Sequence, residues 1–115
     1  MDKEDHTFVV TKGNLYNGIG ERRTPGIKKG HEAFVQRAIA INKTSKTKEI
    51  RIGVVVNGIT FIPIEECKEL DRDRPCKATN IHLSEYQYIE ARFEGVQNND
   101  DLILWVEGTT PLAWI

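Results

Sequence analysis

Histidine and cysteine are the most versatile metal-binding and catalytic residues in this chain, so their spacing comes first. His6, His31 and His82 stand far apart, and none of them has the spacing of a zinc ligand pair. Cys67 and Cys76 have no histidine two to four residues away. Both cysteines lie in a charged stretch and not at a helix start, which would stabilise a thiolate. We therefore expect no metal, no cofactor and no catalytic nucleophile, and hence no enzyme.

The oxidation state of the two cysteines is a separate question. They could close a loop as a disulfide, but the chain opens on the polar segment Met1–Asp5, which lacks the apolar core of an export signal. Cysteines of proteins that stay in a reducing compartment are usually free. We predict two free thiols.

Four aspartates offer oxygens of the kind that calcium prefers. Asp71 and Asp73 alternate with arginines, which neutralise them. Asp100 and Asp101 follow an asparagine pair but lack the glycine and the distal glutamate of a calcium loop. Turn formation suffices to explain all four. Gly18-Ile19-Gly20 is likewise only a fragment of a phosphate-binding loop, without a third glycine or a following helix.

A basic group near the start is the best candidate for contact with an anionic partner, and it consists of Arg22, Arg23, Lys28 and Lys29. Only Tyr16 lies nearby as a stacking aromatic, and the whole chain has a formal net charge of −1. No overall field draws such a protein to nucleic acid or to an anionic membrane. We expect this segment to contact another protein.

Two tryptophans could form a platform for a sugar, because aromatic rings stack on pyranose faces. Trp105 lies in the middle of an expected strand, and Trp114 lies in an apolar carboxyl-terminal segment. Tryptophans in such places more often belong to a core or a subunit interface. The segment Pro111–Ile115 is apolar throughout, which predicts a homo-oligomer, most plausibly a trimer.

The elements that would position these residues are strands. At 115 residues the chain is long enough for one domain. Ile50, Ile52, Val54 and Val56 fall on one parity and Glu49 and Arg51 on the other, which is the pattern of a strand with one buried face. The run 49–64 is folded by Asn57-Gly58, a pair suited to a type I′ hairpin turn, and Pro63 predicts an edge strand or a strand end.

Three further runs extend this pattern. Val35, Ile39 and Ile41 in the run 32–42 are expected to share one face, and Leu102–Val106 is expected to be a late strand. Residues 84–94 fit both strand and helix spacing, and their β-prone composition favours strand. Residues 65–78 are so rich in alternating charges that we expect a solvated connection there.

The glycine-rich residues 11–30 are expected to form an extended arm, because glycines lose backbone entropy without adding packed side chains. The predicted organisation is an N-terminal strand and arm at 1–30 and a sandwich domain at 31–115. Deletion of residues 1–30 is then expected to leave the β-structure intact.

Residues 31–108 resemble a β-sandwich module of phage structural proteins, such as capsid decoration and head-fibre proteins. Four features carry the resemblance: the strand His31–Asn42, which ends in an Asn-Thr-Ser turn; its partner Lys48–Val56; the segment Ile81–Leu83, which leads into Tyr88–Glu94; and the closing strand Asp101–Gly108. The resemblance implies an all-β antiparallel sandwich of jelly-roll or immunoglobulin type, self-association, and attachment to a virion assembled in the host cytoplasm.

The function expected on these grounds is that of a bacteriophage capsid decoration protein, a non-enzymatic structural protein that binds the major capsid protein or another virion protein. The alternative is a carbohydrate- or receptor-binding β-sandwich module, because the same scaffold serves both kinds of function.

Overall fold

The computed structural model describes residues 4–10, 15–16, 19–97 and 99–110. These residues form strands, turns and loops and include no helix, so none of them lies in a helix that could cross a membrane. The strands are β1 (Glu4–Val10), β2 (Leu15–Tyr16), β3 (Ile19–Arg23), β4 (Ala33–Asn42), β5 (Thr47–Val56), β6 (Thr60–Leu70), β7 (Cys76–Leu83), β8 (Tyr88–Glu94) and β9 (Leu102–Thr110).

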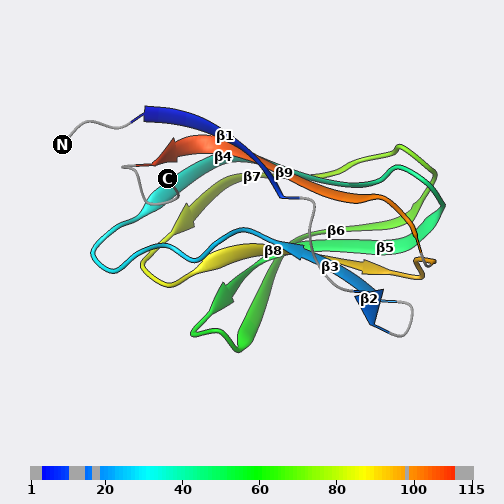
Figure 1. The fold of residues 1–115 in the computed structure, drawn as a ribbon, viewed down its shortest axis with the longest axis horizontal. Helices are drawn as coiled ribbons and strands as arrows, with labels where there is room; N and C mark the ends of the chain where they lie inside the picture. The colour runs from blue at the N-terminus through cyan, green and yellow to red at the C-terminus, as the bar shows by residue number, and fades with distance from the viewer. Residues whose placement is uncertain (1–3, 11–14, 17–18, 98, 111–115) are drawn as a thin grey trace.

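The strands form two antiparallel sheets that pack as a sandwich (Figure 1). One sheet has four strands in the order β1-β9-β4-β7, and the other has five in the order β2-β3-β8-β5-β6. The expected all-β antiparallel sandwich is confirmed. Tyr88–Glu94 is a strand inside the five-stranded sheet, so the ambiguity of residues 84–94 is resolved in favour of strand.

The core lies between the inner faces of the two sheets. Alternate residues of the central strands face it, as the period of two predicts. Its largest fully buried members come from both sheets, and they include Phe93, Ile50, Ile52, Ile89, Leu83, Leu102, Leu104 and Val106.

The hairpin between β5 and β6 is formed as the sequence predicts. Asn57 and Gly58 have φ angles of 57° and 69°, which are the positive values of a type I′ turn. β6 is an edge strand, so Pro63 removes no hydrogen bond that an inner strand would need. The hairpin projects from the sandwich at the bottom of Figure 1.

The charged segment 65–78 is not the loop we expected. β6 continues to Leu70 and β7 begins at Cys76, so that only a short turn separates them. Nearly every side chain of β6 is exposed, because an edge strand held by the ladder of β5 needs little burial of its own. Alternating charges therefore marked an exposed strand and not a connection.

The prediction of free thiols is also wrong. Cys67 in β6 and Cys76 in β7 form a disulfide, with Cα atoms 5.8 Å apart. The chain crosses from the five-stranded to the four-stranded sheet between them, and the bond joins the sheets at that edge. The prediction of free thiols rested on the polar segment Met1–Asp5 and the reducing compartment inferred from it, and not on the geometry of the pair.

Residues 11–30 do not form an extended arm where the structure describes them. β3 pairs with β8 along its whole length, and Ile27 lies in the core with 1% of its surface exposed. The backbone after β3 is fixed by hydrogen bonds, from Thr24 N–H to the Ile89 carbonyl (3.0 Å) and from Ile27 N–H to the Gln87 carbonyl (3.0 Å). Ladder bonds and one buried isoleucine outweigh the entropy cost of the glycines here. Residues 11–14, 17–18 and 111–115 lie outside the described part.

Candidate functional site

Two neighbouring strands of the four-stranded sheet break their alternation at the same place. In β4 the consecutive residues Gln36 and Arg37 are both exposed. In β7 the consecutive residues Thr79 and Asn80 are both exposed. Val35 pairs with Ile81 and Arg37 with Thr79, so Gln36 and Asn80 fall opposite each other on adjacent strands. Two residues with amide side chains thus lie at opposite positions of adjacent strands, and both are exposed.

Gln36 is a β-bulge relative to the other neighbour, β9, where the register shifts between Val35 and Arg37. The bulge corrects one expectation. Val35 faces the core, but Ile39 and Ile41 lie half-buried on the outer face, because the extra residue reverses the alternation that the sequence suggested.

Gly108 of β9 makes room for this bulge. A Cβ at that position would lie 2.2 Å from the carbonyl oxygen of Phe34 and 2.8 Å from the Cα of Val35. Both distances are too short for any side chain. A glycine is required where β9 passes the bulged part of β4.

Beyond the two amides, an aromatic ring and an imidazole form a stacked pair. Phe34 and His82 are partners in the β4–β7 ladder, and their ring centroids are 4.8 Å apart at an interplanar angle of 30°. Phe34 is 40% exposed. His82 Nε2 lies 3.0 Å from a carboxylate oxygen of Glu32, which holds the imidazole in place.

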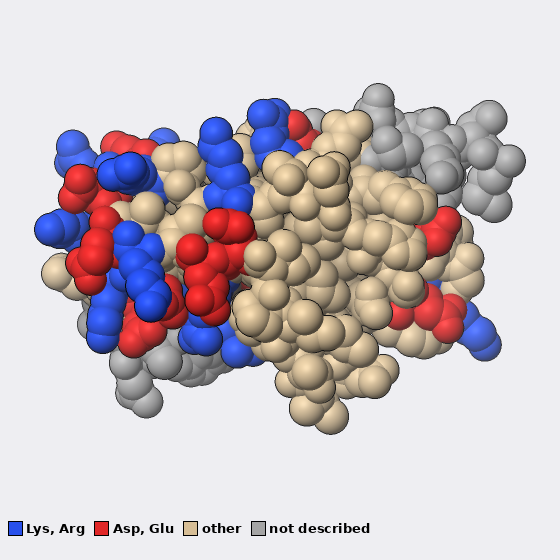
Figure 2. All heavy atoms as spheres, turned by 180° about the vertical axis from the view of Figure 1, so that it is seen from behind, with Lys and Arg blue, Asp and Glu red and all other residues tan. Residues whose placement is uncertain are grey.

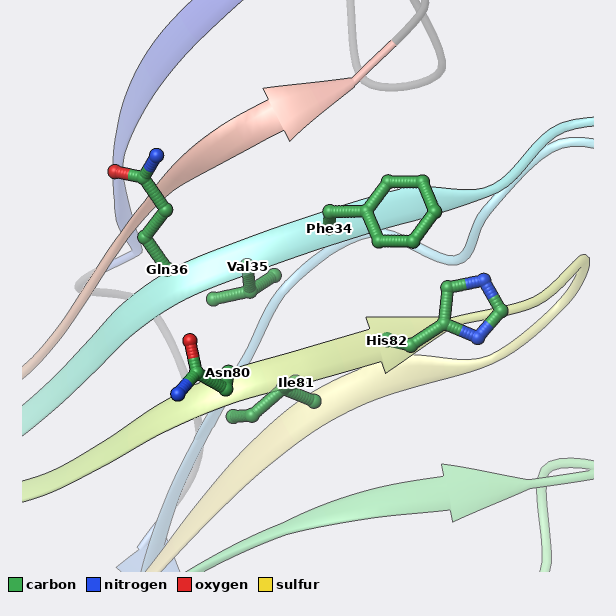
Figure 3. Close-up of a pocket in the computed structure, with 6 residues that line it drawn as sticks. All are labelled: Phe34, Val35, Gln36, Asn80, Ile81 and His82. Carbon is green, nitrogen blue, oxygen red and sulfur yellow. The ribbon is translucent and has the colours of Figure 1, made fainter.

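A hollow of about 200 Å³ opens on this surface between β4 and β7. Its lining consists of Phe34, Val35, Gln36, Asn80, Ile81 and His82 (Figure 3). Val35 and Ile81 are buried core residues at its centre, and the exposed rings and amides stand on either side of them. A shallow site of this kind offers a flat apolar contact together with amide donors and acceptors.

The same outer face continues past the hollow with apolar and paired side chains. Arg37 and Glu107 form an ion pair across β4 and β9. Trp105 is 38% exposed and donates a hydrogen bond from its indole nitrogen to Glu107 (3.3 Å). It lies opposite Ile39 and is not part of the core, which was one of the two places expected for it. Trp114 falls outside the described residues.

Two of the four residues of the basic group near the start of the chain, Arg22 and Arg23, are engaged within the molecule, whereas Lys28 and Lys29 are exposed. Arg22 is buried between the sheets and donates from Nε to the carbonyl of Leu102 in β9 (2.9 Å). Burial lowers the pKa of Arg22, and the nearby charge of Asp101 opposes that shift. Arg23 forms an ion pair with Glu21 and lies 3.7 Å from a carboxylate oxygen of Glu90. Neither arginine is placed to capture an anionic partner.

Asp100 is one of the aspartates that could offer oxygens to calcium. Its carboxylate instead links the β8–β9 loop to the end of β4 and the loop that follows β4. Its carboxylate accepts hydrogen bonds from Ser45 Oγ (2.7 Å), the Gln97 N–H (2.8 Å) and Asn42 Nδ2 (3.1 Å). Burial acts to raise the pKa of Asp100, but these hydrogen bonds outweigh it and lower the pKa below its usual value. Among the described residues, no three or more His, Cys, Asp or Glu side chains are grouped to hold a metal ion.

The opposite face of the sandwich carries a dense set of ion pairs. Glu90 is buried and accepts a hydrogen bond from Arg92 Nε (2.7 Å), while the Arg92 guanidinium lies 4.0 Å from the centroid of the Phe61 ring. Other described charges on this surface are also paired, as Arg51 is with Glu49 and Lys48 with Glu94.

Sequence reasoning did not find the hollow. The signal was present as two pairs of consecutive polar residues inside otherwise alternating runs, Gln36-Arg37 and Thr79-Asn80. Such pairs are typical of bulges, which often lie beside binding sites.

Comparison with known proteins gives the fold and little more. No protein-family model and no curated protein sequence matches the chain. Among solved structures, it is similar to the C-terminal domain of a chitobiase from Bacteroides fragilis, with a TM-score of 0.50 and 17% identity over 80% of this chain. The match spans 64% of that domain. A carbohydrate-binding module of family 29 matches at a TM-score of 0.38 and 11% identity, over 93% of this chain and 88% of that one, and superposes too loosely to support a conclusion.

Proposed function

We propose that this protein is a non-enzymatic binding module and that its ligand is a carbohydrate, held at the hollow between β4 and β7. The observation that carries the proposal is the exposed Phe34–His82 stack beside the paired amides of Gln36 and Asn80. This is the alternative that the sequence left open, placed on specific residues.

The chemistry of the hollow fits a sugar for two reasons. A pyranose ring has apolar C–H faces that pack on an aromatic ring, and it has hydroxyl groups around its rim. An amide side chain both donates and accepts hydrogen bonds, so it can match a hydroxyl, which does the same. Phe34 supplies the first contact, and Gln36 and Asn80 supply the second.

The described residues that line the hollow include no carboxylate, ammonium or guanidinium group, which also favours a neutral ligand. The carboxylate of Glu32 is engaged with His82, and the lining groups are otherwise aromatic, aliphatic or amide. Most glycans lie outside the reducing cytoplasm. The Cys67–Cys76 disulfide supports the same location for this protein, because disulfides persist in oxidising compartments. The sandwich fold shared with a chitobiase domain is compatible with this role.

Retention on polysaccharides tests the proposal. Pull-down on insoluble chitin and cellulose, and electrophoresis in gels that contain soluble glucans or mannans, should reveal binding to at least one of them. Phe34→Ala and Asn80→Ala should each weaken that binding by about tenfold, since each removes one stacking or hydrogen-bonding group.

A matched control lies far from the hollow, at the tip of the β5–β6 hairpin, where Ile59 is 84% exposed. Ile59→Ala should bind the glycan like the unmodified protein. No retention on any glycan, or equal binding by Phe34→Ala, would contradict the proposal.

A second candidate is capsid decoration, and one observation favours it. The β5–β6 hairpin exposes Ile59, Ile62 and Ile64, and the projection that it forms in Figure 2 carries no charged side chain at its end. A protein partner, such as a major capsid protein, would bury these side chains, and a trimer built through residues 111–115 belongs to the same proposal. Ile62→Ser should then abolish attachment to capsids while glycan binding stays unchanged, whereas Phe34→Ala should do the opposite.

A further inference from the structure

We infer that the binding site continues from the hollow across the sheet to Trp105, and that its ligand is an extended, uncharged polysaccharide chain and not a single sugar. This inference rests on the proposed function and names the class of ligand.

Phe34 and Trp105 lie on the same outer face of the four-stranded sheet. Phe34 is exposed at the start of β4, and Trp105 is exposed in β9 opposite Ile39 of β4. The bulge at Gln36 is what brings Ile39 to this face, since strict alternation would have turned it inward. A second ring is thus available on the surface that the hollow occupies.

The two rings are too far apart to hold one sugar between them. Ile39 is five positions beyond Phe34, one of which is the bulged residue. At about 3.3 Å per strand residue, roughly 13–17 Å along the sheet separate Phe34 from Ile39, the residue opposite Trp105. A single pyranose is much shorter than that, whereas a chain of a few sugars in extended form spans it.

The surface between the rings fits the faces and edges of such a chain. The amides of Gln36 and Asn80 and the hydroxyl of Thr79 lie on the outer face near Phe34, and half-buried Ile39 lies beside Trp105. Amides and hydroxyls can bond the rim of each sugar, while the aliphatic surface accepts its C–H face.

The charges on this face cancel among the described side chains. Arg37 is paired with Glu107, and Glu32 with His82, while Lys77 stands opposite Ile39. Two formal positive charges, Arg37 and Lys77, thus balance two negative ones, Glu32 and Glu107, with His82 counted as neutral. A polyanionic glycan would need a basic surface, and a polycationic one an acidic surface. The ligand that matches is uncharged.

The test is a calorimetric titration of the full chain with a length series of neutral oligosaccharides. Cello-, chito- and manno-oligosaccharides from the disaccharide to the hexasaccharide should be compared with the acidic polysaccharide alginate. For the glycan that binds, affinity should rise about tenfold with length and then level off once the chain reaches both rings. Alginate should bind at least tenfold more weakly than the neutral hexasaccharide.

Variants separate the two ends of the site. Trp105→Ala should remove the gain with length, so that the hexasaccharide binds like the disaccharide. Trp105→Phe should keep most of the gain because it keeps a ring. Phe34→Ala should lower the affinity for both the disaccharide and the hexasaccharide. The thermal unfolding midpoint of each variant shows whether that variant is folded.

The failure of this inference is distinct from the failure of the proposed function. Affinity that is independent of length, or a Trp105→Ala variant that binds the hexasaccharide like the unmodified protein, overturns the extended site while Phe34-dependent binding upholds the hollow. Alginate that binds as tightly as the neutral chain overturns the uncharged ligand. Absence of binding to every glycan overturns both.

Discussion

Gln36 and Asn80 lie opposite each other on adjacent strands, each at the point where its strand stops alternating. Because the two irregularities coincide, the β4–β7 register is kept while both side chains turn outward. The result is an amide pair fixed on a rigid sheet and not on a loop, which is the placement that gives a binding site its precision.

The bulge at Gln36 depends on Gly108. Gly108→Ala should lower the free energy of unfolding by about 1–3 kcal/mol, because its Cβ would meet the Phe34 carbonyl oxygen at 2.2 Å. Urea denaturation measures the loss. Gly26→Ala is the matched control, because the added Cβ would lie 3.7 Å from the backbone oxygen of Tyr86, an ordinary van der Waals contact, and stability should change by less than about 0.5 kcal/mol. Equal stability of both variants would show that β9 does not pass the bulge as closely as described.

The Cys67–Cys76 disulfide joins the two sheets at one edge and closes a short loop. Reduction with dithiothreitol should therefore lower the free energy of unfolding by about 2–4 kcal/mol. The unfolding midpoint of Cys67→Ala/Cys76→Ala should not respond to the reductant. Two thiols that react with an alkylating reagent in the folded, non-reduced protein would contradict the bond.

Asp100 makes stability depend on pH. Its pKa is lowered in the folded state, so it contributes stability above its ordinary pKa, and this contribution is lost as the pH falls through the folded-state value. Between about pH 5 and pH 2 the unmodified protein should thus lose more stability than Asp100→Asn, which has no such titration. Urea denaturation across this range is the measurement, and parallel losses in the two proteins would refute the role of the carboxylate.

The amino-terminal strands β1 and β3 are part of the sandwich. Deletion of residues 1–23 removes β1 and β3, which pair with β9 and β8, and removes the Arg22 side chain that bonds the Leu102 carbonyl. The truncated chain should lose cooperative unfolding, contrary to what a detachable arm would allow. Circular dichroism during heating measures this loss. A truncated protein with the original β spectrum and a sharp transition would contradict this account and support a detachable arm.

The sequence predicted the parts of this fold that depend on local patterns. The alternation of Ile50, Ile52 and Val54 gave the central strand, and Asn57-Gly58 gave the hairpin turn, because both follow from backbone geometry over a few residues. The burial of Arg22 and Ile27 depends on partners far along the chain, so no local pattern predicts it. The disulfide joins cysteines that are only 9 positions apart, but cysteine spacing alone does not tell a bonded pair from two free thiols. The candidate site was missed for a related reason. A bulge reverses every later side chain of its strand, and reading β4 as strictly alternating put Ile39 and Ile41 on the wrong face.

Mapping the ligand contact by nuclear magnetic resonance tests the central claim most directly. Titration of labelled protein with the tightest-binding neutral oligosaccharide should shift the amide and side-chain signals of Phe34, Gln36, Asn80 and His82, and leave those of Ile59 and Ile62 on the hairpin unchanged. Such a pattern places the sugar in the hollow between β4 and β7. Shifts confined to the hairpin, or to the Glu90–Arg92 face on the other side of the sandwich, would contradict the account.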